Sequence, residues 1–229
     1  IREHNTALSI VDCVTSLGAC NVPVDEWKLD IVASGSQKGY MIPPGLSFIA
    51  MSQKAWEAAE KSNLPKFYLN LKSYKKSLLS NSNPYTPAVN LVFALDEALK
   101  MMREEGLDNI FLRHNKHKLA MSNAVRALNL ELFADEKCLS PSITAIKTEG
   151  MDAEEFRKTI KNNFDILLAG GQDHLKGKIF RVGHLGYVND RDIITVVSAM
   201  SNTLLKLGKI SAQQAGEALV VASRYLEEN

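Results

Sequence analysis

The segment Asp30–Leu46, D-I-V-A-S-G-S-Q-K-G-Y-M-I-P-P-G-L, decides how the rest of the chain is interpreted. Its apolar start predicts a buried strand, and a short polar loop then leads to one lysine, Lys38. No other charged residue lies between Asp30 and Lys54. An ammonium group in apolar surroundings is poorly solvated, which makes the neutral, nucleophilic amine accessible. The segment therefore indicates Schiff-base chemistry at Lys38, and an ordinary loop lysine after a strand is the alternative interpretation.

A carboxylate upstream is the second candidate. Asp12 follows the apolar run Ala7–Val11, which predicts a short buried strand of a parallel sheet. In open α/β sheets, ligands bind beyond the carboxyl ends of the strands, so Asp12 and Lys38 could share one crevice. Taken alone, Asp12 is explained more simply as a strand-end aspartate that caps the following loop.

The motif S-G-S-Q-K-G at residues 34–39, followed by P-P-G-L at residues 43–46, resembles the lysine segment of the class V (fold-type I) aminotransferases, which use pyridoxal phosphate (PLP). The most similar group is the alanine–glyoxylate and serine–glyoxylate (serine–pyruvate) aminotransferases, which includes the small subunit once named a soluble hydrogenase of cyanobacteria. The similarity extends from the first residues to about Leu207. It implies a PLP-dependent transamination between a small amino acid (alanine, serine or aspartate) and a 2-oxo acid such as glyoxylate or pyruvate.

The resemblance gives the first two candidates their roles. Lys38 would hold PLP as the internal aldimine and then move the α-proton of the substrate as general base and acid. Asp12 would keep the pyridine nitrogen protonated, so that the ring accepts electrons from a carbanion. Gln37 and Val14 would line the edge and face of the ring, and an ordinary core valine is the alternative for Val14.

The resemblance also implies a contribution from a neighbouring subunit. Thr86, with Tyr85 beside it, would reach the cofactor phosphate of that subunit. Thr86-Pro87 begins a predicted long helix, and a helix N-terminus is a ready anion site. An N-cap threonine explains Thr86 equally well. If Thr86 acts across an interface, the protein is at least a homodimer with its active site between the subunits.

Arg181 lies in F-R-V-G-H-L-G, residues 180–186, and resembles the family's arginine for the substrate carboxylate. A guanidinium binds a carboxylate through two parallel hydrogen bonds, although a structural ion pair at a strand end is the alternative. Cysteine desulfurases of the same fold carry R-x-G-H-H-C at this place. Gly186 stands where that cysteine would lie, so a desulfurase is disfavoured.

The order of predicted elements indicates an α/β fold in three parts. Residues 1–105 would be the remainder of a large PLP-binding domain with a mostly parallel sheet, 106–129 a linking helix, and 130–229 a small α+β domain. The polar segment 72–86 is predicted as a loop. Further strands are predicted at 46–51, 130–134, 142–147 and 178–183. Helices are predicted at 52–61, with Ser52 as the N-cap, and at 86–104, 107–128, 153–163, 190–207 and 212–228.

Composition excludes several classes of protein. The 229 residues include 27 Lys and Arg against 26 Asp and Glu, so no strong field favours nucleic acid or an anionic membrane. No apolar run approaches the roughly 20 residues that span a bilayer, and no leader or address tag is recognisable, so a cytoplasmic location is expected. Three unpatterned cysteines (Cys13, Cys20 and Cys138) and scattered histidines predict no metal site.

The start of the chain supports a second hypothesis. It begins at Ile1 without methionine, whereas members of the resembled family carry a long N-terminal part with a phosphate-binding loop and an aromatic residue that stacks on the cofactor. The chain would then be the C-terminal portion of a longer protein, and a non-catalytic fragment or subunit that needs the missing part. Among enzymes, another class V type, such as a phosphoserine or aspartate aminotransferase, is the runner-up.

Overall fold

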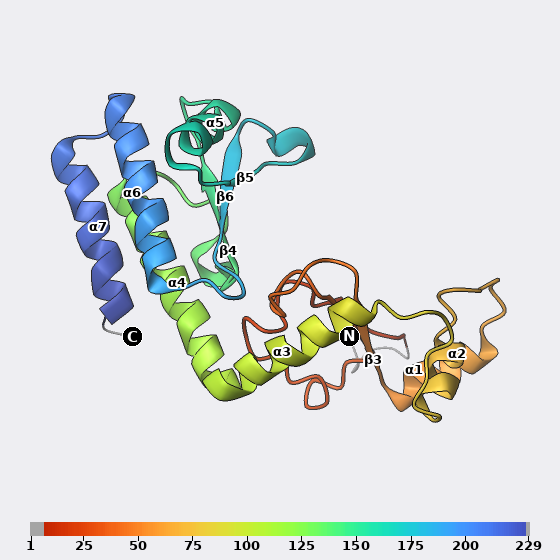
Figure 1. Cartoon of the computed structure of the whole chain (residues 1–229). Coiled ribbons are helices and arrows are strands. Elements are labelled where there is room, and N and C mark those ends of the chain that lie inside the picture. The colour runs from red at the N-terminus through yellow and green to blue at the C-terminus, as the bar shows by residue number, and fades with distance from the viewer. Residues whose placement is uncertain (1–6, 228–229) are drawn as a thin grey trace. The chain divides into compact units, whose positions relative to one another are not determined.

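The computed structural model describes residues 7–227, so Glu228, the predicted last residue of the C-terminal helix, lies outside the described residues. The chain forms two compact units. The first comprises the residues up to Val14 together with Val22–Met101, and the second comprises Thr15–Asn21 together with the residues from Met102 onward. Each unit combines a three-stranded sheet with helices, in agreement with the predicted α/β class (Figure 1).

The sheet of the first unit has the strand order β1-β2-β3. β1 (Ile10–Asp12) and β2 (Ile31–Gly35) are parallel, as predicted, whereas β3 (Ser47–Met51) is antiparallel to β2. The sheet is therefore mixed rather than mostly parallel. Residues 36–46 contain no helix and are too few for the crossover that a parallel neighbour would require, so the chain returns directly as an antiparallel strand.

A buried carboxylate joins the beginnings of β1 and β2 to the end of β3. Asp30 is 0% exposed, and its Oδ2 accepts hydrogen bonds from the backbone N–H and hydroxyl of Ser9 at 3.0 and 3.3 Å. Its Oδ1 accepts a hydrogen bond from the Ser52 hydroxyl at 2.9 Å, and the ammonium of Lys54 lies 3.6 Å from Oδ2. Because several donors converge on it, the carboxylate remains satisfied without water.

Two short helices follow the first sheet. α1 (Gln53–Lys61) has Ser52 as its N-cap, as predicted, and the Ser52 hydroxyl accepts a hydrogen bond from the Ala55 N–H. α2 (Leu71–Leu78) overlaps the first half of the segment 72–86 that the sequence predicts as a loop, so the prediction was wrong over residues 72–78. The α2 N-cap residue is Asn70, and Lys75 places its ammonium 4.4 Å from the centre of the Trp56 ring. Polar composition alone does not reveal this cap and contact.

The long helix α3 (Val89–Glu105) contains the boundary between the units. It begins later than predicted, because the Val89 N–H donates to the Pro87 carbonyl in a turn before the helix. Thr86 is therefore not the helix N-cap. Gly106, at a φ of +83°, ends α3, and α4 (Leu107–Ala127) follows at once. α4, predicted as a linking helix, lies wholly in the second unit.

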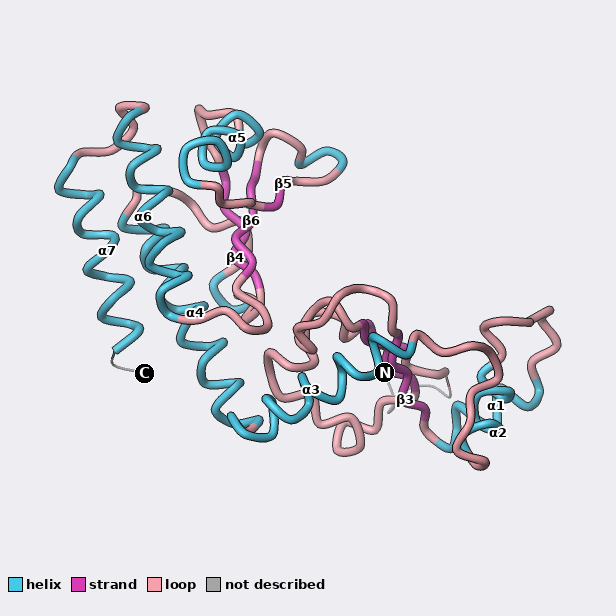
Figure 2. Tube along the Cα trace, viewed as in Figure 1, coloured by secondary structure: helices cyan, strands magenta, loops and turns pink. Residues whose placement is uncertain are grey.

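The second unit contains an antiparallel sheet with the order β4-β6-β5 (Figure 2). Its strands are β4 (Ile143–Lys147), β5 (Ala169–Gly170) and β6 (Ile179–Gly183), and the short 3-10 helices η1 (Glu136–Cys138) and η2 (Asp173–Leu175) lie between the larger elements. The helices besides α4 are α5 (Ala153–Phe164), α6 (Asp190–Lys206) and α7 (Ala212–Glu227). The predicted strand 130–134 was wrong, since this segment contributes only the isolated bridge between Leu132 and Ile146.

The core of the second unit forms where α4, α6 and α7 pack on one another, and α5 packs on α6 and on strands β5 and β6. One face of the sheet supplies Ile146, Phe180 and Val182, and the helices supply Met121 and Met200, all of them buried. No helix in the described residues is both long and apolar enough to cross a membrane.

Candidate active site

Asp12 and Lys38 both belong to the first unit and lie at the same edge of its sheet, where β1 and β2 end. Asp12 is the last residue of β1, and it is the register partner of Ala33 in the parallel strand β2. Parallel strands end at a common edge, and Lys38 follows the end of β2 at Gly35 by three residues. The topology thus brings together the two residues from which the sequence predicts chemistry.

The carboxylate of Asp12 can fill both roles that the sequence suggests, the cap of the following loop and the partner of a ligand. Its Oδ1 accepts a hydrogen bond from the Val14 N–H at 2.9 Å, so it caps the turn after β1. Its second oxygen has no hydrogen-bond partner among the described residues, and the side chain is exposed. The bond to Val14 therefore fixes the carboxylate and leaves one oxygen for a ligand. Val14 itself is half-buried directly after it.

The two serines of the S-G-S-Q-K-G motif hold the loop that carries Lys38. The Ser36 hydroxyl is buried, donates to the Pro43 carbonyl at 2.8 Å and accepts from the Leu46 N–H at 3.1 Å. The Ser34 hydroxyl donates to the Cys13 carbonyl at 3.4 Å and so ties the end of β1 to β2. Both serines are therefore structural.

Lys38 is half-buried, and its ammonium has no hydrogen bond or ion pair within residues 7–227. Its carbonyl accepts the Met41 N–H at 3.0 Å, so the backbone is fixed while the amine is left available. The Gln37 side chain lies back over the end of β2, because a Cβ added to Gly35 would meet Gln37 Oε1 at 3.0 Å. Gln37 therefore lies at the same edge of the sheet.

The residues at this edge fit pyridoxal phosphate. An unpaired amine and a carboxylate with a free oxygen are the two groups that hold its aldehyde and its ring nitrogen. Alternate side chains of a strand share a face, so Ala33 and Gly35 lie on the face of Asp12. Their small size leaves that face open between the two functional groups.

Tyr85 and Thr86 also belong to the first unit. The Tyr85 hydroxyl donates to the Phe67 carbonyl at 3.1 Å, and its ring packs on Tyr68 and Tyr74 with centroid distances of 4.8 and 6.2 Å. Thr86 is exposed, and no hydrogen bond joins it to Asp12 or Lys38 in the described chain. Tyr85 is thus held in an aromatic cluster, whereas the hydroxyl of Thr86 is accessible.

Arg181 belongs to the second unit and occupies the central strand of its sheet. Its Nε donates to the Gly170 carbonyl at 2.9 Å, and its two terminal nitrogens have no partner among the described residues. Its register partners are Ala145 and Ala169, both of which are small. The Nε of the half-buried guanidinium is therefore held in place, while its two terminal nitrogens can bind two carboxylate oxygens.

The loop after Arg181 is held by a cluster of buried histidines that the sequence analysis did not single out. His184 is 0% exposed, and its ring nitrogens lie 2.9 Å from the Thr144 hydroxyl and 3.0 Å from the Pro141 carbonyl. Burial lowers the pKa of His184 to about 4, so the ring is neutral and both nitrogens are used.

Two histidines of α4 complete this cluster. His114 Nδ1 donates to the Ile110 carbonyl at 2.7 Å, and its Nε2 accepts the Gly186 N–H at 3.1 Å. His117 Nε2 lies 2.9 Å from Asp190 Oδ1, and burial lowers the pKa of both histidines. The contacts of His114 with Gly186 and of His117 with Asp190 join residues more than 70 positions apart, so local sequence patterns give no signal for them.

Arg113 fixes the same loop from α4. It donates to the carbonyls of Gly186 and Val188, both at 2.9 Å, and it pairs with both carboxylate oxygens of Glu105. The segment between Arg181 and α6 is therefore rigidly attached to α4. No group of three or more His, Cys, Asp or Glu side chains that could hold a metal ion occurs in residues 7–227.

Comparisons with known proteins agree with the resemblance seen in the sequence. The soluble hydrogenase small subunit of Synechococcus sp. is 55% identical over 226 residues, which cover 99% of this chain and 59% of that protein. The serine–glyoxylate aminotransferase of Methylorubrum extorquens is 36% identical over 231 residues, or 97% of this chain and 57% of that protein. The ureidoglycine–glyoxylate aminotransferase of Bacillus subtilis, a solved structure, matches with a TM-score of 0.87 and 31% identity over 95% of this chain and 58% of its own.

The chain thus spans between half and three-fifths of the length of these relatives. The sequence model of the family described as aminotransferase class-V matches residues 1–192, which is most of the chain. The prediction of the family is confirmed: this chain belongs to the class V aminotransferases.

Proposed function

We propose that this chain carries the catalytic lysine and aspartate of a PLP-dependent aminotransferase, which moves an amino group from alanine, serine or aspartate to glyoxylate or pyruvate. The proposal depends on one observation: Asp12 and Lys38 lie at the common edge where the parallel strands β1 and β2 end. The relatives named as glyoxylate aminotransferases favour glyoxylate as the acceptor. They favour serine as one of the candidate donors.

The residues at the edge divide the chemistry between them. Bound PLP supplies the electron sink that stabilises a carbanion. The amine of Lys38 would hold the cofactor at its aldehyde, and as a free amine it would serve as the base for the α-proton of the substrate. The free oxygen of Asp12 keeps the ring nitrogen protonated, because a carboxylate favours a neighbouring positive charge. Gln37 and Val14 would line the edge and face of the ring.

Arg181 is proposed to bind the α-carboxylate that amino and 2-oxo acids share. The bond from its Nε to the Gly170 carbonyl fixes the plane of the guanidinium. The small side chains of Ala145 and Ala169 leave that face of the sheet accessible. Two parallel hydrogen bonds to a carboxylate would orient the α-carbon for proton removal.

A homodimer is proposed because the segment Leu64–Phe93 exposes an extensive apolar surface. Leu69 is 80% exposed, Leu79 is 84% exposed and Phe93 is 72% exposed. Large exposed apolar patches mark sites of protein association. Thr86 lies within this segment with a free hydroxyl, so it can act on the cofactor phosphate of a second subunit, with Tyr85 beside it. Sedimentation of the chain, with and without the double change Leu79→Ser and Phe93→Ser, tests this association.

The second candidate is that the chain is inactive until it is joined to the rest of a longer protein. The share of the relatives that it covers supports this hypothesis. The first sheet also supports this hypothesis, because Ile10 lies on the same face as Asp12 and is 71% exposed. An exposed isoleucine beside a functional carboxylate is what a surface covered by a further segment would show.

One experiment tests the proposal and separates these two candidates. The chain is incubated with PLP, reduced with borohydride and digested, and the modified lysine is identified by mass spectrometry. The expected result is one PLP-modified peptide that contains Lys38, lost in Lys38→Ala and retained in Lys61→Ala, whose side chain is exposed on α1. Modification of several surface lysines to equal extents would contradict the cofactor site.

The same experiment is repeated with the chain joined to the part of the Synechococcus relative that lies outside the match. Specific labelling of Lys38 and transaminase turnover in the joined protein alone would favour the second candidate. Labelling of Lys38 with turnover in the chain by itself would exclude it. No labelling of Lys38 in either protein would overturn the proposed function.

A further inference from the structure

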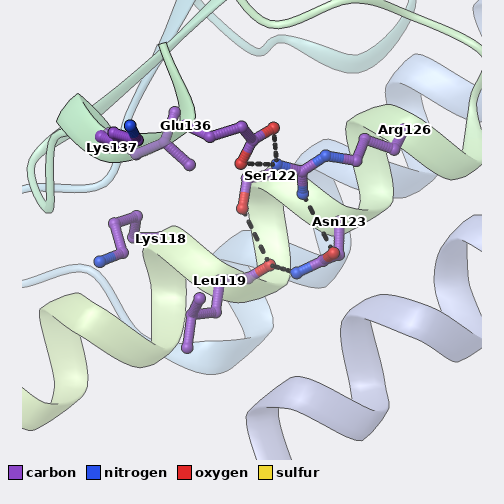
Figure 3. A pocket seen from close by; sticks show the side chains of 8 residues that line it. Lys118, Leu119, Ser122, Asn123, Arg126, Glu136 and Lys137 are labelled. Carbon is purple, nitrogen blue, oxygen red and sulfur yellow. Dashed lines mark hydrogen bonds and ion pairs between the residues drawn. The ribbon is translucent and has the colours of Figure 1, made fainter. Parts of the chain in front are cut away.

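A polar pocket of about 450 Å³ lies between α4 and the short helix η1 of the second unit (Figure 3). Its walls are formed by Lys118, Leu119, Ser122, Asn123, Arg126, Glu136, Lys137 and Leu139. None of these residues belongs to those assigned above to the cofactor or the substrate. The volume falls in the range of small-molecule sites, and the wall carries three cationic side chains against one carboxylate.

One end of this pocket is already neutralised by internal bonds. A terminal nitrogen of Arg126 pairs with both carboxylate oxygens of Glu136, and the other donates to Asn123 Oδ1 at 3.0 Å. Asn123 Nδ2 in turn donates to the Leu119 carbonyl at 2.8 Å. Figure 3 shows this chain of contacts on one side of the pocket. The positive charge of Arg126 is thus matched by Glu136, and this end leaves no net charge for a ligand.

The other end carries two lysines whose charges are not matched. Figure 3 shows Lys118 of α4 and Lys137 of η1 on opposite walls of the pocket, both on the side away from Arg126. Neither ammonium has a hydrogen bond or ion pair with any described residue. The nearby Asp135 does not line the pocket, and its Oδ1 is engaged as the cap that accepts the Lys137 backbone N–H at 2.8 Å.

We propose that this pocket binds a small organic phosphate, with its phosphate dianion between Lys118 and Lys137. Two ammonium groups match two negative charges and offer up to six N–H donors to the phosphate oxygens. A planar carboxylate would instead suit the two parallel N–H groups of an arginine. The arginine of this pocket, Arg126, is already paired with Glu136. The organic part of the ligand lies toward Leu119 and Leu139, which supply the apolar wall.

The test follows the backbone amide signals of the whole chain by NMR during titration with inorganic phosphate and with glycerol phosphate, at constant ionic strength. The amides of residues 118–126 and 135–139 are expected to shift and saturate, with tighter binding for glycerol phosphate. Lys118→Gln and Lys137→Gln should each weaken binding about fivefold, since each removes one unit charge near the ligand. The double variant should show no saturation at these amides.

The controls separate this site from other effects of anions. Lys158→Gln, a change of an exposed lysine on α5, should leave the affinity within about twofold of the parent. Thr86→Ala removes the hydroxyl proposed for the cofactor phosphate and should leave these shifts unchanged. Both lysines of the pocket are on the surface, and unchanged melting temperatures will show that the variants fold.

Three results would overturn the proposal. The first is an equal response to acetate, a monoanion, which would show a general ionic effect. The second is an equal loss of affinity in Lys158→Gln. The third is saturation at other amides with none at residues 118–126 and 135–139, which would place phosphate elsewhere on the chain.

Discussion

Asp12 of β1 and Ala33 of β2 are register partners in a parallel pair, so their side chains lie on the same face of the sheet. This one pairing determines where the carboxylate stands relative to the loop that follows β2. A slip of the register by one residue would turn Asp12 to the opposite, buried face, where Val32 and Ser34 lie. The proposed site therefore depends on the pairing of three-residue and five-residue strands.

Asp12→Asn tests the charge of this residue separately from its structural role. The asparagine side chain retains an oxygen that can accept the Val14 N–H, so the turn after β1 should persist. The loss of the negative charge should lower kcat by about 10²-fold or more, since the ring nitrogen would no longer be held protonated. Turnover and the melting temperature are measured together, with Asp25→Asn as a control at an exposed aspartate. Full activity in Asp12→Asn would remove Asp12 from the mechanism.

Asp30→Ala should destabilise the first unit. The change leaves the Ser9 N–H and the Ser52 hydroxyl without their buried acceptor, and it removes the partner of Lys54. We expect a loss of about 3 kcal/mol in the free energy of unfolding of this unit. Urea unfolding followed by the fluorescence of Trp27 and Trp56, both of which belong to the first unit, measures it. Glu26→Ala, at an exposed position, should change the same quantity by less than about 0.5 kcal/mol.

Much of the fold follows from local sequence patterns. The N-cap at Ser52 and the long helices α4, α6 and α7 were predicted to within a few residues, because caps and apolar periodicity are local. The common edge of Asp12 and Lys38 could also be predicted, since two apolar runs that each end in polar residues indicate parallel neighbours. These features need only neighbouring residues to specify them.

The features that the sequence did not reveal depend on distant contacts. α2 lies in a polar segment, and an aromatic cluster that includes Tyr68, Tyr74 and Tyr85 packs beside it. The chain at 130–134 has the composition of a strand, but it makes only one bridge to β4. The histidine cluster unites β4, α4 and the loop after β6, and such pairings leave no local pattern.

Gly216→Ala should stabilise the second unit. Gly216 lies in the interior of α7, and a Cβ added there would meet no atom within 4 Å. Alanine has a higher helix propensity than glycine, so the free energy of unfolding should rise by about 0.5–1 kcal/mol. Gly208→Ala serves as the contrasting variant, because its space is equally open but its φ of +64° strains any side chain. Thermal unfolding of the two variants should move in opposite directions.

Acid should destabilise the second unit through His184. Its pKa in the folded state is about 4, below the usual value of 6.5, so the unfolded state binds more protons between these pH values. The stabilisation is complete above pH 6.5 and is lost as the pH falls toward 4, by an amount on the order of 3 kcal/mol. His114 and His117, which face it from α4, shift in the same direction and add to the effect.

Urea unfolding of the second unit at several pH values measures this dependence. His184→Asn keeps a donor for the Pro141 carbonyl but cannot be protonated, so it should be less stable at pH 7 and show a smaller loss toward pH 4. An unchanged slope in this variant would assign the acid sensitivity to other groups.

Arg181→Lys tests whether the guanidinium binds the substrate carboxylate. Lysine keeps the positive charge but offers one ammonium in place of the planar fork, and it loses the Nε bond to the Gly170 carbonyl. In a preparation that shows turnover, we expect KM for the amino donor and the oxo acid to rise about 10-fold to 100-fold, with a smaller change in kcat. An amine donor without a carboxylate should react equally well with the parent and the variant, because it makes no bond to the guanidinium. Arg191→Lys, an exposed change on α6, is the matched control, and an equal rise in KM there would contradict a specific role of the Arg181 guanidinium.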